Sequence, residues 1–202
     1  MIPYKIILAS IGIGVAFIGY IPYFRGMFAG RTKPHAFSWL IWTILVSIAF
    51  AAQLSESGGA GSWVTGSSAL LCFLVFLFAF VKGDRKFVLF DWMSLFLAFC
   101  AIALWVITND PTFSIILVVV SDALGFLPSF RKAYLLPHEE TASLYAFASI
   151  KFFLSLISLE RFVLATWLFP AYLMVTNALF VVYLLWRRRV LLLAPVKEKT
   201  VG

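Results

Sequence analysis

Two segments of this chain share one sequence pattern: residues 19–39 read GYIPYFRGMFAGRTKPHAFSW, and residues 125–145 read GFLPSFRKAYLLPHEETASLY. Gly, Pro, Phe and Arg recur at a constant separation of 106 residues, and each stretch contains a Pro-His pair that holds one of the chain's two histidines. Proline and glycine often mark helix ends, but that tendency does not explain a shared spacing. The repeat predicts two copies of one structural unit.

The composition predicts a membrane protein. Of 202 residues, 63% are hydrophobic and 12% are charged, and the mean hydropathy is +1.01. One water-soluble core could not hide this much apolar surface. A spanning helix needs about 20 mostly apolar residues, and the charged and turn-forming residues leave seven such stretches. The expected helices are Lys5 to Phe24, Ala36 to Leu54, Trp63 to Val81, Phe87 to Ile107, Thr112 to Phe130, Ala142 to Leu159 and Phe162 to Trp186.

Lysine and arginine gather on one side of this arrangement. Thirteen of the 16 follow the first, third, fifth and seventh helices, whereas only Lys5 and Arg161 lie on the opposite side and Lys151 lies inside the sixth helix. Because basic loops stay in the cytoplasm, the N-terminus is predicted outside and the C-terminus inside. The same asymmetry accounts for the net charge of +7 without a nucleic-acid partner.

An odd number of helices in the repeated unit constrains the topology. Three crossings leave the chain on the far side of the bilayer, so a fourth helix must return it before a parallel copy can begin. The expected fold is therefore an all-α integral membrane protein with two parallel three-helix bundles, helices 1–3 and 5–7, joined by linker helix 4. The expected divisions are residues 1–82, 83–110 and 111–190, followed by a cytoplasmic tail over residues 191–202.

The motif in the first stretch resembles that of the PQ-loop superfamily, which includes the SWEET sugar facilitators and the lysosomal cystine carrier. It comprises a helix-ending proline, a basic residue followed by Ser or Thr, and an apolar-Ser start to the next helix, here Pro22, Arg31, Thr32, Phe37 and Ser38. Tyr23 and Ser129 stand where the family has glutamine. The stretch TKPHAFSWLIW resembles still more closely a group of uncharacterised bacterial proteins, which implies a bacterial inner membrane.

The resemblance implies transport of a small polar solute, such as a sugar, an amino acid or a similar metabolite, by alternating access. Two alternatives stay open: a seven-helix receptor or sorting protein on the same fold, and a vitamin-precursor facilitator resembling nicotinamide riboside transporters. The expected partners are the solute and the lipid bilayer, and the oligomeric state is open, with a homo-oligomer as one alternative.

Four prolines are implied hinges by the same resemblance: Pro22, Pro128, Pro34 and Pro137. A proline removes a backbone donor and loosens the preceding turn. The residues alone favour a simpler role for Pro34 and Pro137, as the first residues of helices. For Pro22 and Pro128, helix termination is as well supported as a hinge.

Two ionisable residues lie near the middle of predicted spans, where a charge costs about 2.5–3.5 kcal/mol on insertion scales. Asp122 lies in the fifth helix and Lys151 in the sixth. Consecutive helices are expected to be neighbours, so these side chains are predicted to meet at one depth. They form either a structural ion pair or a proton or substrate site.

Further candidate substrate contacts come from the other spans. Asn177 falls where SWEETs place a sugar-contacting asparagine, although an asparagine can also bond a neighbouring helix. When helices 3 and 7 are aligned, Phe73 falls opposite Asn177. The candidate polar contact in helix 3 is then Ser68, which lies a turn or more away from Phe73. Trp42 and Tyr145 could stack on a ring-shaped solute or pack against lipid and helices.

Motifs for catalysis, zinc or nucleotide binding are absent from the sequence, so neither an enzyme nor a cofactor or metal is expected. Cys72 and Cys100 lie inside predicted spans without CxxC spacing, and are expected to pack as small apolar groups.

Overall fold

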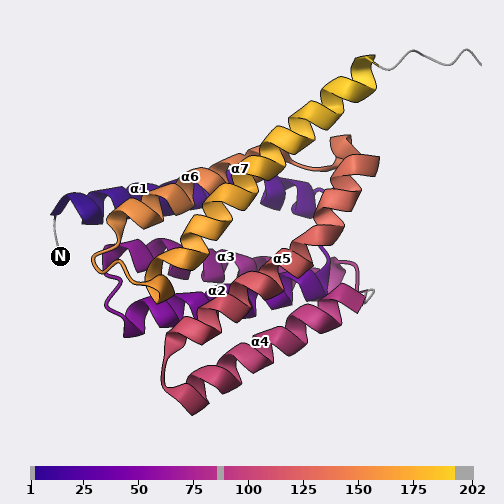
Figure 1. Cartoon of the computed structure of the whole chain (residues 1–202). Helices are drawn as coiled ribbons and strands as arrows, with labels where there is room; N and C mark the ends of the chain where they lie inside the picture. The colour runs from indigo at the N-terminus through magenta and orange to yellow at the C-terminus, as the bar shows by residue number, and fades with distance from the viewer. Residues whose placement is uncertain (1–2, 86–88, 194–202) are drawn as a thin grey trace, which may run out of the picture.

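A computed structural model describes the chain except for residues 1–2, 86–88 and 194–202. The described residues form seven α-helices and one short 3-10 helix, η1 (Figure 1). The elements are α1 Pro3–Phe28, α2 Ala36–Ser55, α3 Ala60–Lys82, α4 Leu89–Thr108, α5 Pro111–Leu135, η1 Pro137–Glu139, α6 Ala142–Ser158 and α7 Leu164–Leu193. Apart from an isolated bridge between His35 and Asp84, this part of the chain contains no β-structure. The all-helical prediction is confirmed.

Six of these helices are long and apolar enough to cross a membrane. The exception is α6, whose 17 apolar residues are at the lower end of the spanning range of about 17–25. Large apolar side chains are exposed on every α-helix, including Val106 and Ile107 at 78% each. A water-soluble protein does not expose apolar surface on all its elements, so the helices are built for a lipid environment.

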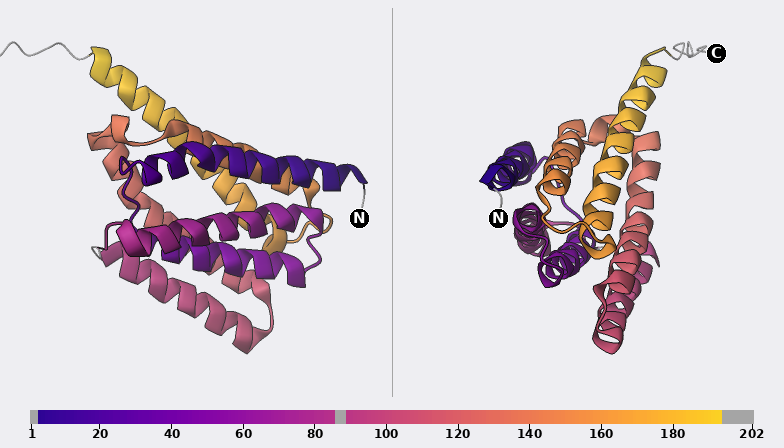
Figure 2. Two further views of the ribbon diagram at one scale, coloured as in Figure 1. Left: turned by 180° about the vertical axis from the view of Figure 1, so that it is seen from behind. Right: turned by 60° about the vertical axis from the view of Figure 1, so that its left-hand side comes forward.

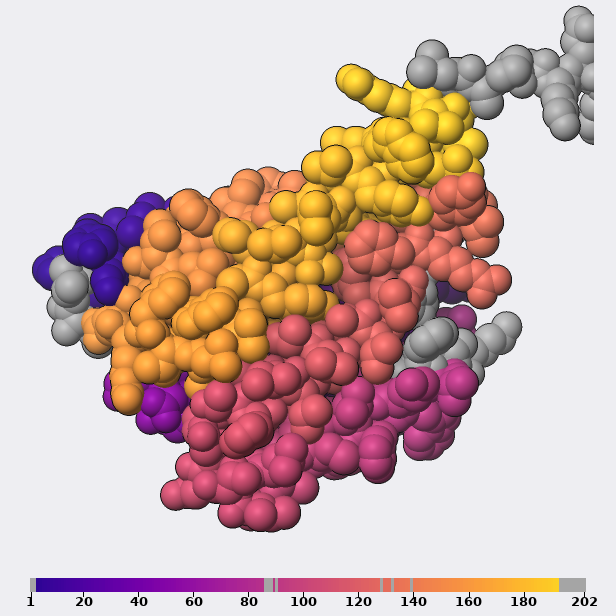
Figure 3. Space-filling view, in the orientation of Figure 1, coloured from indigo at the N-terminus to yellow at the C-terminus, as the bar shows by residue number. Residues whose placement is uncertain are grey.

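Successive helices run in opposite directions between two ends of the molecule (Figures 1 and 2). The N-terminus and the α2–α3, α4–α5 and α6–α7 loops lie at one end. The α1–α2, α3–α4 and α5–α6 connections lie at the other, where the last turns of α7 project beyond the body (Figure 3). The predicted tail over residues 191–202 lies largely outside the described residues, because α7 itself continues to Leu193.

Three helices extend well past their predicted ends. α1 continues through Pro22 to Phe28, and α5 continues through position 128 to Leu135. Of the two alternatives left open for these prolines, helix termination is excluded, because a proline removes one backbone donor without preventing the helix from continuing. The side chain of Pro128 lies outside the described residues.

The other two candidate hinges, Pro34 and Pro137, differ from each other in their positions. Pro34 lies in the α1–α2 loop, and α2 begins only after His35, whose Nδ1 accepts a hydrogen bond from the Ser38 backbone. The prediction that Pro34 starts a helix is wrong, because His35 provides the N-cap instead. Pro137 does start a helix, but the helix is η1 and not α6.

The beginning of α5 shows how local sequence sets a boundary. Asp110 Oδ1 accepts a hydrogen bond from the backbone N–H of Thr112 at 2.8 Å, and Pro111 is the first helical residue. This is the usual combination of an acidic cap and a proline that needs no donor. The hydrogen bond from Thr112 favours the ionised carboxylate and lowers the pKa of Asp110.

The helices form a closed ring of contacts. In order around it, α1 packs on α3, α3 on α2, α2 on α5, α5 on α7, α7 on α6, and α6 on α1. α4 lies outside this ring against α5 and α2, as the right view of Figure 2 shows. The expectation that α5 and α6 are neighbours is wrong, because α7 lies between them.

One helix pair comes unusually close. The Ser155 hydroxyl of α6 donates to the Gly61 carbonyl of α3 at 2.8 Å. A Cβ on Gly61 would lie 2.5 Å from the Ser155 carbonyl oxygen and 2.8 Å from the Leu159 nitrogen. Small residues allow this backbone approach, which stabilises helix pairs in membranes.

Gly61→Ala is expected to destabilise the protein by about 1–3 kcal/mol, because the added methyl group meets backbone atoms that cannot move alone. Gly14→Ala in α1 is the matched control, since a Cβ there meets nothing within 4 Å. The control should be neutral or slightly stabilising. Thermal unfolding in detergent measures both, and equal stabilities of the two variants would contradict the close α3–α6 contact.

Candidate functional site

A cavity of about 310 Å³ lies inside the helix ring. All six ring helices contribute to its lining, whereas no described residue of α4 does. Residues 32–35 of the α1–α2 loop also line it, together with Glu140 and Thr141 before α6. Because the described loops at the opposite end contribute nothing, the cavity extends from mid-helix toward the end that carries the α1–α2 and α5–α6 connections.

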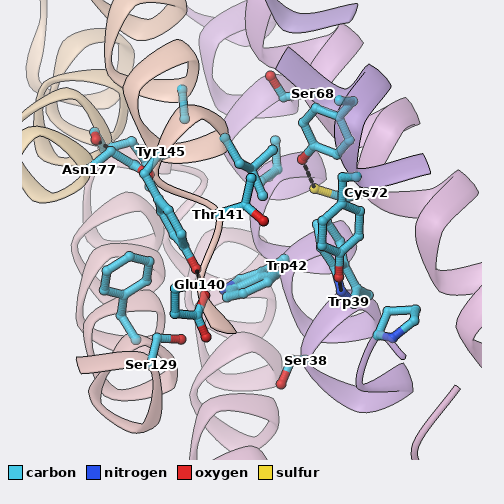
Figure 4. A pocket seen from close by; sticks show the side chains of 18 of the residues that line it. Ser38, Trp39, Trp42, Ser68, Cys72, Ser129, Glu140, Thr141, Tyr145 and Asn177 are labelled. Atoms are coloured by element: carbon cyan, nitrogen blue, oxygen red, sulfur yellow. Dashed lines mark hydrogen bonds between the residues drawn. The ribbon is translucent and has the colours of Figure 1, made fainter. Parts of the chain in front are cut away.

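All six predicted substrate contacts line this one cavity. They are Trp42 from α2, Ser68 from α3, Asp122 from α5, Tyr145 and Lys151 from α6, and Asn177 from α7. Figure 4 shows Tyr145 and Asn177 on one side and Ser68 on the other, with Trp42 between. The sequence thus selected residues that the fold brings together, and their binding of a solute stays a prediction.

Aromatic rings form much of the wall. Trp39 and Trp42 stand edge to face with ring centroids 5.1 Å apart, and Trp39 Nε1 donates to the Tyr23 hydroxyl at 3.2 Å. On the other side Tyr145 packs on Phe180 at 4.3 Å. Trp42 and Tyr145 both line the cavity, and each packs on a neighbouring ring and not on lipid.

Lys151 is 3% exposed, and its Nζ lies 5.4 Å from the Tyr20 ring centre and 4.8 Å from that of Phe152. Within the described part of the chain, the ammonium has no hydrogen bond and no ion pair. The side chain forms no ion pair with Asp122, although the structure describes both residues. The predicted ion pair is wrong, because the two helices are held apart by α7 and by the cavity itself.

Asp122 is also 3% exposed and accepts a hydrogen bond from the Tyr172 hydroxyl of α7 at 2.9 Å. The sequence offered no signal for this partner, because only the packing of α5 on α7 places Tyr172 there. The Asp122 carboxyl group therefore lines the cavity with a neutral hydroxyl as its hydrogen-bond donor.

The amide nitrogen of Asn177 donates to the Leu173 carbonyl one turn earlier at 2.7 Å. The predicted bond to a neighbouring helix is therefore wrong for this group. Ser68 behaves in the same way, since its hydroxyl donates to the Val64 carbonyl at 2.8 Å. Both side chains line the cavity while bonded within their own helices.

Cys72 is a lining residue that the sequence did not reveal. Its Sγ lies 3.8 Å from the Tyr20 hydroxyl, and both residues line the cavity. Cys72 packs in a buried apolar cluster with Leu71 and Val75, as expected, and the Tyr20 hydroxyl is an additional polar neighbour of its thiol. Its spacing from Ser68, one helical turn, is the signal that could have identified it.

The four candidate hinges are distributed over the same end of the molecule, and of these Pro34 lines the cavity. Pro22 lies inside α1 between the lining residues Tyr20 and Tyr23. Their role as hinges stays a prediction.

Within the described residues, no group of His, Cys, Asp or Glu side chains could hold a metal ion. Comparison with protein-family models, with curated proteins and with solved structures finds no match. The likeness to the PQ-loop superfamily stays a prediction that rests on the motif.

Double-mutant cycles can test which partner Asp122 has. Asp122→Ala and Tyr172→Phe should be coupled by about 1.5–3 kcal/mol, because the first variant removes the acceptor and the second removes the donor of the hydrogen bond between them. Asp122→Asn and Lys151→Met should be additive to within about 0.5 kcal/mol. Unfolding in detergent gives both coupling energies, and stronger coupling to Lys151 than to Tyr172 would contradict the arrangement.

Proposed function

We propose that the chain is a membrane transporter that moves a small polar solute by alternating access between two parallel three-helix bundles. The observation that carries this proposal is the cavity, which combines buried charged and polar side chains with access toward one end of a membrane-type helix ring. Ionisable groups are kept inside such a ring where they face a water-filled path or a ligand.

The order of helix contacts supports the two-bundle arrangement. In residues 1–82, α3 packs between α1 and α2, and in residues 111–190, α7 packs between α5 and α6. The halves then meet in equivalent ways, through α1 with α6 and α5 with α2, and through α3 with α6 and α7 with α2. A twofold axis along the membrane normal relates helices in this manner, with α4 as the connection.

The lining residues follow the same relation. Eight pairs of cavity-lining positions are separated by the 106 residues of the sequence repeat: Tyr20 and Phe126, Tyr23 and Ser129, Pro34 and Glu140, His35 and Thr141, Ser38 and Leu144, Trp39 and Tyr145, Trp42 and Ala148, Val46 and Phe152. The residues of η1 make up for the shorter second motif, so α6 begins in register with α2. The cavity is therefore shaped by equivalent positions of both halves, which suits a solute held at the interface between them.

The end opposite the cavity mouth is closed by contacts between the two halves. Arg161 and Glu56 form an ion pair at 2.8 Å across the α6–α7 and α2–α3 loops. The Glu160 backbone donates to the Gly58 carbonyl at 3.0 Å. We assign the closed end to the outside and the cavity mouth to the cytoplasm, in keeping with the basic residues that follow α1, α3, α5 and α7.

A transporter accounts for the cavity better than a receptor or sorting protein does. The loops between helices are short, and leave little surface for a protein partner. A chamber of about 310 Å³ falls at the lower end of the range for small-molecule sites.

Cys72 allows the accessibility of the cavity to be measured with the natural chain. A membrane-impermeant thiol reagent should modify Cys72 from the side of the C-terminus more than about tenfold faster than from the other side, because a closed layer of packed helices separates it from the far side. The matched variant Cys72→Ala retains only Cys100, which does not line the cavity, and should lose this sidedness.

Counterflow in proteoliposomes tests transport itself, with a panel of sugars, amino acids and vitamin precursors. Exchange of one class, inhibited when Cys72 is modified in the wild type but not in Cys72→Ala, is the expected result. Equal reactivity of Cys72 from both sides, with no exchange of any solute, would overturn the proposal.

A further inference from the structure

Equivalent positions of the two halves line the cavity, but the charged residues Asp122 and Lys151 have no charged equivalents in the first half. One repeat length before Asp122 the chain has Ala16, and one repeat length before Lys151 it has Leu45. Ala16 is 1% exposed and Leu45 is fully buried, so both are packing residues. The first half therefore has an apolar residue at each of the two positions, and both Asp122 and Lys151 belong to residues 111–190.

Lys151 is placed where it can receive an anionic group. Its ammonium lies beside the Tyr20 and Phe152 rings, and within the described residues it has neither a hydrogen bond nor an ion pair. Cation–π contacts offset only part of the free energy that is needed to desolvate an ammonium. A carboxylate or phosphate in the cavity would supply the remainder.

Asp122 offers the opposite charge from another wall. Its carboxylate lies on α5 and is bonded by the Tyr172 hydroxyl, whereas Lys151 lies on α6 beside Tyr20 of α1. The helices α5 and α6 are separated by α7, and the two charges do not pair with each other. Two opposite charges that line one chamber without pairing match a solute that carries both charges itself.

The body of such a solute is indicated by the rings that line the chamber. Trp42 and Tyr145 lie on facing helices, α2 and α6, and Phe126 lies on α5. Each ring is held by other rings, as in the edge-to-face contact of Phe126 with Tyr145 at 6.0 Å. Flat aromatic walls favour a planar, apolar body between the charged groups.

We infer that this cavity binds an amphoteric solute, with an anionic group on Lys151, a cationic or amine group on Asp122, and a planar ring against the aromatic wall. The inference rests on the proposed transport function and specifies the class of solute. It also fixes an orientation, because the charged positions have no counterparts in the first half and the solute cannot bind equally well when turned around.

Three probes with a common ring test it: para-aminomethylbenzoate, which carries both charges, benzoate, which is only anionic, and benzylamine, which is only cationic. Equilibrium binding is measured on the purified full chain in proteoliposomes, with benzyl alcohol as the neutral control. The wild type should bind the amphoteric probe about tenfold or more tightly than any of the other three, since each lacks at least one buried charge contact. This comparison requires no variant.

Two variants then assign the ends. Lys151→Met should reduce affinity for para-aminomethylbenzoate and benzoate by about tenfold or more and leave benzylamine unchanged. Asp122→Asn should reduce affinity for para-aminomethylbenzoate and benzylamine and leave benzoate unchanged. Lys82→Met, at the exposed end of α3 outside the cavity, is the control and should change none of the affinities. A folding defect would weaken all probes together, so it cannot produce these reciprocal patterns.

The outcomes separate the two levels of the proposal. Equal binding of the charged probes and benzyl alcohol, or equal loss of all probes in stable variants, overturns the amphoteric class. Counterflow of a neutral sugar without binding of any charged probe also overturns it, while the transport function stands. If Cys72 has no sided reactivity and no solute exchanges, the transport function itself fails.

Discussion

A charged side chain in the hydrocarbon layer needs water, an opposite charge or a ligand, and this requirement organises the molecule. Asp122 and Lys151 are each 3% exposed, and neither satisfies the other. Both side chains line the cavity between the helices, where water or a ligand can reach them. The aromatic rings around the cavity and the helix contacts outside it separate this polar chamber from lipid.

The fold could be predicted largely from two properties of the sequence. Apolar stretches of spanning length fix the number and type of the elements, and the repeat at 106 residues predicts which positions are equivalent. The helix ends were less predictable. A run of apolar residues shows where lipid contact ends, but α1 and α5 continue beyond their prolines into the more polar segments that follow, because backbone hydrogen bonds persist there.

The site could be predicted as a set of residues but not as a set of contacts. Polar and aromatic residues inside apolar helices are unusual enough to be noticed singly, and all six chosen residues line the cavity. Their partners depend on which helices touch. Because α7 lies between α5 and α6, Asp122 bonds Tyr172 and not Lys151, and nothing in the local sequence of either helix indicates this. Cys72 was missed for a similar reason, since its contact with the Tyr20 hydroxyl depends on the packing of α3 against α1.

The short length of α6 has a consequence for how the protein sits in lipid. At about 1.5 Å per residue, its 17 residues extend about 25 Å, whereas the 26 residues of its neighbour α1 extend about 39 Å. The hydrocarbon layer is about 30 Å thick, so no single thickness matches both helices. α1 must tilt or reach into the headgroups, and the bilayer must thin beside α6. Membrane thickness therefore acts on the contact between α1 and α6, where residues 1–82 meet residues 111–190.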